Sequence, residues 1–194
     1  MTEQDTFIKA EEAFTDVVEQ IRHDQWKIGI SAGPASRAAT TVREALNHHA
    51  YDDSWVLNTL AGETIAEVGT KYDGDLLGDD PRGSWKRITE RTQVAVKNFD
   101  ELDRTVHLSY GDFKAREYLQ HITIFRGLQA WDLAQIIGLD EYQLPSDLVE
   151  AMWVQIAPMA EDLRAMGVFG PEVTVSRDAT LHDRLIGLTG RTPH

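Results

Sequence analysis

The chain has 194 residues, of which 42% are hydrophobic and 26% are charged. These are ordinary values for a globular protein, and they exclude a mostly disordered chain. It contains no cysteine, which excludes disulfides, zinc–cysteine sites and a cysteine nucleophile. The formal net charge of −13 repels phosphate backbones, so nucleic acid is not an expected partner.

The sequence also argues against a membrane partner. No run approaches the roughly 18 apolar residues that a membrane-spanning helix requires. The first residues, MTEQDTFIKAEEAF, are acidic where a secretory signal is basic and then apolar. We therefore expect a soluble, cytoplasmic protein.

Apolar residues at three-to-four spacing predict helices in the first third of the chain. The first covers about Thr6 to His23, and a Ser/Ala/Gly/Pro stretch from Ser31 to Ser36 breaks the pattern. Thr41 and Glu44 then form a capping box, the signature of a helix start. The second predicted helix runs from this box to Gly62.

The middle of the chain predicts a third helix and a short extended segment. Asp80 followed by Pro81 is typical of an N-cap and a first helical residue. After this third helix, Val106, Leu108 and Tyr110 alternate with polar residues. The alternation predicts a short extended crossover.

The last part of the chain predicts a central helix and a divided C-terminal one. Asp112 is expected to cap the fourth helix, which ends at Gly138 and is apolar on nearly every side, as a central helix is. Pro145 opens a fifth helix that Pro158 should kink or divide, and a short helix covers Leu181 to Leu188. We predict one all-α domain over residues 1–194, a four-helix bundle with additional C-terminal helices, and such bundles place ligand sites between facing helices.

Two adjacent histidines stand in the middle of the second helix. The apolar stripe of that helix places His49 near its centre and His48 on its flank. Periodicity alone favours a hydrogen-bonded core histidine over a metal ligand. Converging ligands from another helix are what would change this interpretation.

The predicted central helix carries a polar anomaly. Gln129 falls on the apolar face that includes Tyr118 and Phe125, and Asp132 lies at the edge of that face. A buried amide without a partner costs about 1–3 kcal/mol. Gln129 is therefore expected either to bond a neighbouring helix or to line an internal cavity, and the sequence leaves both open. His121, on the same helix, is expected at the rim.

Six segments in a fixed order resemble a known family. They are TVREALNHH, YDGDLLGDDP, VHLSYGDFKAREYL, AWDLAQIIG and, near the end, GVFGPEV with DRLIGLTGR. Together they are similar to the metal-binding domain of mycothiol-dependent maleylpyruvate isomerases, in the DinB-like superfamily, and in particular to its actinobacterial branch. The resemblance covers about Val42 to Arg191.

The resemblance implies a DinB-like four-helix bundle with a divalent metal of the zinc, nickel or manganese type inside, and mycothiol as the thiol cofactor. Its three metal ligands are a histidine of the second helix and an acid and a histidine of the central helix. Matched to this sequence, they fall on His48, Phe125 and Gln129. Phenylalanine cannot ligate and a glutamine carbonyl is a weak neutral ligand, so only His48 remains of the metal site.

We therefore predict a metal-independent bundle that binds a small molecule and needs no cofactor. Its pocket is expected to be lined by His48, His49, Phe125, Gln129 and Asp132. The alternative is a divalent-metal-dependent, thiol-using transferase or isomerase whose ligands are relocated among His48, His49, His121 and Asp132. Catalytic residues are not identified in either case, and the resemblance suggests a homodimer.

Overall fold

The structure is a computed structural model that describes residues 1–30 and 40–193. Over these residues the fold is mostly helical, and its β-structure is limited to two small antiparallel sheets. The predicted all-α class is therefore confirmed. The break predicted at Ser31 to Ser36 lies outside the described residues. Within the described ranges, no helix has the length and apolar character needed to span a membrane.

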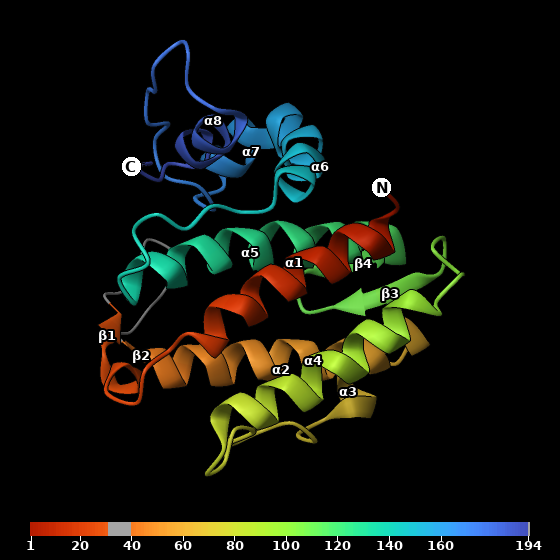
Figure 1. The fold of residues 1–194 in the computed structure, drawn as a ribbon. Helices are drawn as coiled ribbons and strands as arrows, with labels where there is room; N and C mark the ends of the chain where they lie inside the picture. The colour runs from red at the N-terminus through yellow and green to blue at the C-terminus, as the bar shows by residue number, and fades with distance from the viewer. Residues whose placement is uncertain (31–39, 194) are drawn as a thin grey trace.

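Four long helices of the described chain form its body (Figure 1). They are α1 (Glu3–Glu19), α2 (Val42–Ala61), α4 (Pro81–Lys97) and α5 (Ala115–Ile136). α1 packs against α5 and α4, and α4 packs against α2. By contrast, the backbones of α2 and α5 approach each other little. The space between α2 and α5 is therefore occupied or left open by their side chains, because the two backbones are not in close contact.

Capping residues set the starts of α2 and α4, as the sequence predicts. The hydroxyl of Thr41 accepts from the backbone N–H of Glu44 at 3.2 Å, and the Glu44 carboxylate accepts from the backbone N–H of Thr41 at 2.7 Å. Asp80 Oδ1 accepts from the backbone N–H of Gly83 at 3.0 Å, with Pro81 as the first helical residue. These side chains satisfy N–H groups that have no intrahelical partner at a helix start.

Asp80→Ala is expected to lower the free energy of unfolding by about 1 kcal/mol, because the first turn of α4 then loses its side-chain acceptor. Urea unfolding followed by circular dichroism measures the loss. Asp79→Ala, at the adjacent exposed acid, is the matched control and should change stability by less than about 0.5 kcal/mol. Equal losses in the two variants would show that Asp80 does not act as a cap.

The expected extended crossover is an antiparallel hairpin of β3 (Thr105–Leu108) and β4 (Gly111–Lys114). His107 lies opposite Asp112, and the His107 Nδ1 is 2.8 Å from Asp112 Oδ1. The prediction that Asp112 caps the fourth helix is therefore wrong. The residue belongs to β4, where it pairs with His107 across the hairpin, and α5 begins only at Ala115.

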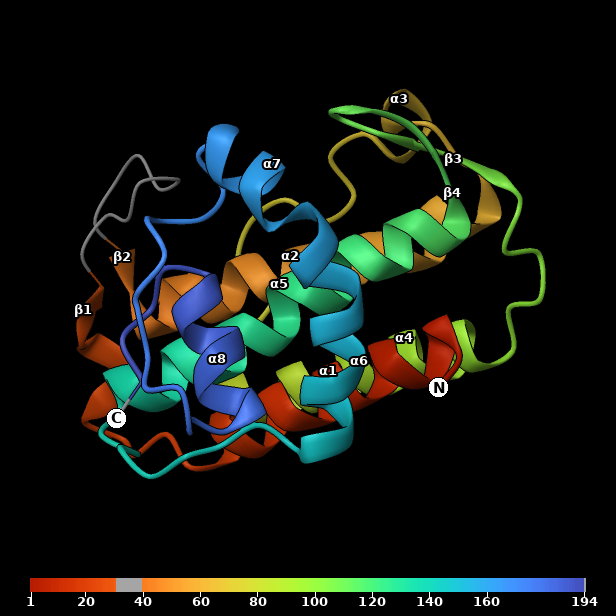
Figure 2. The ribbon, with the colours of Figure 1, turned by 90° about the horizontal axis from the view of Figure 1, so that it is seen from above.

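Short elements lie at the two ends of the bundle. η1 (Gln25–Lys27) and the sheet of β1 (Gly29–Ile30) and β2 (Thr40–Thr41) lie at one end. α3 (Ile65–Val68) lies at the other end, which it shares with the β3–β4 hairpin (Figures 1 and 2). The hairpin and α3 therefore lie beside the C-terminal end of α2 and the N-terminal end of α5.

The C-terminal helices cover one side of the bundle. They are α6 (Ser146–Ile156), η2 (Ala157–Met159), α7 (Ala160–Ala165) and α8 (Leu181–Leu188), and Pro158 divides the segment as predicted. α6 packs against α5 and α1, and α8 packs against α6, so these helices lie over α1 and α5 on the side away from α2 and α4 (Figure 1). With α1, α6 and the hairpin all against it, α5 is the central helix that its apolar sequence predicts.

Buried apolar side chains form two clusters in the described structure. The larger includes Phe14 of α1, Trp85 of α4 and Leu128 of α5. The smaller includes Phe7 of α1 and Leu119 of α5, and hairpin residues pack against it. Both clusters also include residues of α2, with Leu46 in the larger and Val56 in the smaller, so α2 contributes to the core that holds α5.

Candidate functional site

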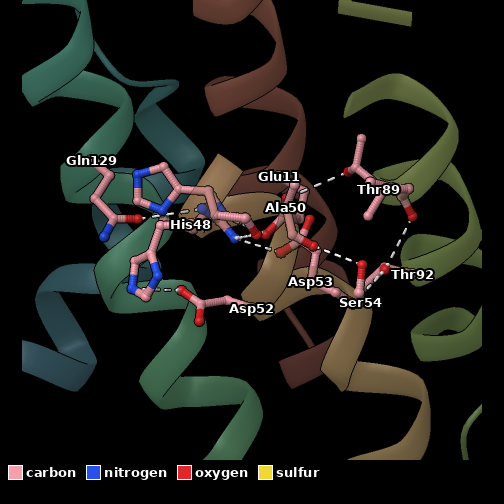
Figure 3. A network of polar contacts seen from close by, with 12 residues as sticks. Glu11, His48, Ala50, Asp52, Asp53, Ser54, Thr89, Thr92 and Gln129 are labelled. Carbon is pink, nitrogen blue, oxygen red and sulfur yellow. Dashed lines mark hydrogen bonds and ion pairs between the residues drawn. The ribbon is translucent and has the colours of Figure 1, made fainter. Parts of the chain in front are cut away.

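A network of buried charges joins three of the long helices. Arg126 of α5 is 2% exposed, and Glu11 of α1 and Asp53 of α2 are both 0% exposed. The Nε of Arg126 donates to Glu11 Oε1 at 2.7 Å, and its Nη2 donates to Asp53 Oδ1. Figure 3 shows Glu11 and Asp53 meeting between the helices. One guanidinium therefore ties α5 to both α1 and α2.

Burial determines the charges of this network. Loss of hydration raises the pKa of Glu11 to about 8, because it acts together with the nearby Asp53 charge and outweighs the attraction of Arg126. Burial likewise raises the pKa of Asp53. Burial alone would lower the pKa of Arg126, but the two carboxylates overcome it and raise that pKa. At neutral pH Glu11 is therefore largely protonated, which reduces the negative charge that the network buries.

Aromatic rings and a hydroxyl complete the surroundings of the network. The Arg126 guanidinium lies over the rings of Phe14 and Trp85, 5.0 Å and 5.3 Å from their centroids. The Thr89 hydroxyl donates to Glu11 Oε2 at 3.4 Å. The charge of Arg126 is thus compensated inside the fold.

A pocket of about 450 Å³ lies beside this network, between α2 and α5. Residues of α3 and of the β3–β4 hairpin complete its wall. Tyr118, at 6% exposure, lies deep in it, whereas Tyr110 and Phe125, at 61% and 46%, lie at its rim. Its wall is aromatic, aliphatic and polar, and consists of His48, Tyr51, Asp52, Trp55, Thr59, Ile65, His107, Leu108, Ser109, Tyr110, Tyr118, His121, Ile122, Phe125, Arg126 and Gln129.

Three of the predicted site residues, His48, Phe125 and Gln129, line this one pocket from its two sides. His48 is exposed; its ring stacks on Tyr51, and its Nε2 is 3.8 Å from Asp52 Oδ2 (Figure 3). Phe125 has no hydrogen-bonding atom in its side chain. The carbonyl oxygen of Gln129 accepts from Arg126 Nη1 at 3.4 Å, so the amide bonds within its own helix beside the pocket.

The structure places the other two predicted residues away from this wall. The ring of His49 meets the ring of Phe14 edge-on at 5.0 Å, on the core side of α2. Burial lowers the pKa of His49 well below its usual value. Both carboxylate oxygens of Asp132 accept from Arg191, each at 2.7 Å, so Asp132 ties the C-terminal segment to α5.

The wall of the pocket does not fit the divalent metal that the family resemblance implies. At the three matched positions, Phe125 offers no donor, the Gln129 carbonyl accepts from Arg126, and only His48 offers an imidazole nitrogen. Over the described ranges, no three histidine, aspartate or glutamate side chains are grouped so as to hold a metal ion. Relocated ligands are not gathered either, because His48 and His121 line the pocket while His49 and Asp132 lie elsewhere.

Sequence reasoning missed the residues that give the pocket its character. Tyr51 and Trp55 line it from α2, Asp52 lies beside them, and Tyr110 reaches it from the turn of the hairpin. A signal was present in the sequence, since His48, Tyr51, Asp52 and Trp55 follow one another at the three-to-four spacing of a helix face.

Comparisons of this chain with protein-family models, with curated proteins and with solved structures found no match. Inference about function therefore rests on the site itself. Its features are a concave wall with five aromatic side chains, a few polar groups, and a neighbouring buried network in which Arg126 is paired with two acids. These are the features of a small-molecule binding site.

Proposed function

We propose that this protein is a metal-independent helical bundle that binds a small organic molecule in the pocket between α2 and α5. The observation that carries the proposal is the pocket of about 450 Å³, with five aromatic side chains in its wall. A volume of this order suits a small ligand, and such sites use apolar walls with a few polar groups that orient the molecule.

The rigid surroundings of the pocket support this proposal. Arg126 lines the pocket and is held by buried ion pairs to two other helices, which favours a wall that is formed before the ligand binds. A preformed site loses little free energy in ordering itself on binding. The pocket is also open at Phe125 and Tyr110, whose exposed rings leave a way in from solvent.

We also propose that the bundle is DinB-like, on the strength of the ordered motifs between Val42 and Arg191. In that family the ligands and the thiol cofactor mycothiol meet at a metal. Here the matched positions hold Phe125 and Gln129, so we propose that pocket contacts alone hold the ligand.

A fragment screen tests the proposed function. Aromatic and heteroaromatic fragments that span cationic, neutral and anionic groups are added to ¹⁵N-labelled protein in parallel samples with and without an excess of EDTA. We expect amide shift changes to gather on the pocket segments of α2, α5 and the hairpin. Fragments that bind only elsewhere, or binding that EDTA abolishes, would overturn the proposal.

A variant at the rim locates the binding. Phe125→Ala should weaken the bound fragments about tenfold, because it removes an aromatic contact from the wall. Val94→Ala, at a similarly exposed apolar residue of α4, is the matched control and should leave affinity unchanged. The same loss in both variants would place the binding outside the pocket.

A further inference from the structure

The aromatic side chains of the pocket come from three separate elements. Tyr51 and Trp55 belong to α2, Tyr118 and Phe125 to α5, and Tyr110 to the turn of the hairpin. The rings of Tyr51 and Trp55 lie 5.8 Å apart, centroid to centroid. The face of an aromatic ring carries negative potential, and rings gathered around a space attract a cation placed in it.

One carboxylate lies among these rings. Asp52 lines the same pocket, and its side chain is 47% exposed, so a ligand can reach it. The negative charge of Asp52 acts on both Tyr110 and Tyr118. Burial raises the pKa of the two phenols, and the Asp52 charge raises it further. An ammonium group placed among the rings would therefore have a counter-ion within the same wall.

The other ionisable groups of the pocket do not oppose a cation. The Arg126 charge is compensated by Asp53 and, once it ionises, by Glu11. The remaining basic groups are His48, His107 and His121. Burial lowers the pKa of His121, which favours its uncharged form, while His48 and His107 each lie beside a carboxylate, Asp52 at 3.8 Å and Asp112 at 2.8 Å. The chain as a whole carries a formal charge of −13, a field that draws cations towards it.

We infer that the ligand of this pocket is a small organic cation: an amine or quaternary ammonium group attached to an aromatic or apolar body. The inference rests on the proposed binding function and names the class of molecule that the site takes. The cationic group lies against Asp52 and the surrounding rings. The apolar body lies along Ile65, Leu108 and Ile122, the aliphatic part of the wall.

Three probes of nearly equal size test the inference at pH 8: 2-phenylethylamine, 2-phenylethanol and 3-phenylpropionate. Titration calorimetry gives their affinities, and amide shifts locate them. We expect the amine to bind about tenfold more tightly than the alcohol, and the carboxylate to bind more weakly than either. An alcohol or carboxylate that matches the amine would overturn the inference.

Variants separate the contribution of Asp52 from that of net charge. Asp52→Asn should weaken the amine about tenfold and change the alcohol less than twofold. Asp16→Asn, which removes an exposed acid of α1, makes the same change in net charge and should alter neither. If Asp52→Asn does not fold, Phe125→Leu keeps an apolar side chain at an exposed position and should reduce the preference for the amine. An unchanged preference in the folded variants would overturn the inference.

Failure of this inference can be told from failure of the proposed function. Fragments that gather on the pocket without favouring cations leave the proposed function standing and show that the ligand class is wrong. The absence of any fragment from the pocket shows that both are wrong.

Discussion

Arg126→Met is expected to lower the free energy of unfolding by about 3–5 kcal/mol, because removal of one partner leaves buried acids without compensation. Glu11 and Asp53 are both inaccessible to solvent, so water cannot replace the lost guanidinium. Urea unfolding at neutral pH, followed by tryptophan fluorescence and circular dichroism, measures the change. Where Arg126→Met alone does not fold, the triple variant described below, which removes the buried charges together, carries the test.

Two further variants show whether the loss comes from the buried charges. Arg116→Met removes an arginine of the same helix whose ion pairs with Glu3 and Asp103 lie at the surface, and it should lower stability by less than about 1 kcal/mol. The triple variant Arg126→Met, Glu11→Leu, Asp53→Leu removes all the charges together and should recover most of the loss. A loss for Arg126→Met no larger than that for Arg116→Met would contradict the expectation.

The sequence predicts the helices well because their signals are local. The capping box of Thr41 and the Asp80–Pro81 pair act within one helical turn, and each fixes a helix start in the structure. The sequence predicts the hairpin less well, since the alternation of Val106 and Leu108 indicates extended backbone but does not identify the partner strand. Asp112 suits an N-cap by residue type, and only its pairing with His107 across the hairpin places it in β4.

The candidate site could be predicted only in part, because its geometry depends on how helices face one another. The spacing of residues within one helix shows which of them share a face. It predicts His49 towards the apolar stripe of α2 and His48 on its flank, and the structure places them in this way. It cannot show that Asp132 meets Arg191, which lies 59 residues further along the chain.

The sequence carries a signal for the buried network. Glu11 stands on the apolar stripe of α1 and Asp53 on that of α2, while Arg126 stands in a helix that is apolar on nearly every side. Acids and a base at core positions are seldom buried unless they pair. Complementary charges on three apolar faces would therefore have predicted that these helices meet at Arg126.

The stability of the protein is expected to fall as the pH rises from about 6.5 to 9. The pKa of Glu11 is about 8 in the folded protein and 4.5 for an ordinary glutamate, so the folded state holds this proton more tightly than the unfolded state. The resulting stabilisation is complete below pH 4.5 and is lost as the pH rises through 8. Between pH 6.5 and 9 the free energy of unfolding should decrease by about 2 kcal/mol.

Glu11→Gln isolates this effect, because an amide keeps the hydrogen-bonding shape of the protonated acid and does not ionise. The pH window matters. Burial lowers the pKa of His49, so protonation of that histidine in the unfolded state reduces stability below about pH 6.5 and would obscure the glutamate at lower pH. Above that pH the Glu11→Gln variant should show a nearly flat stability, apart from the contribution of Asp53, whose pKa is raised in the same direction.

Glu12→Gln, at the adjacent exposed position, is the matched control and should keep the slope of the parent protein. A parent whose stability is flat from pH 6.5 to 9, or a Glu11→Gln variant that retains the full slope, would show that Glu11 is already ionised at neutral pH and that the network carries a net negative charge.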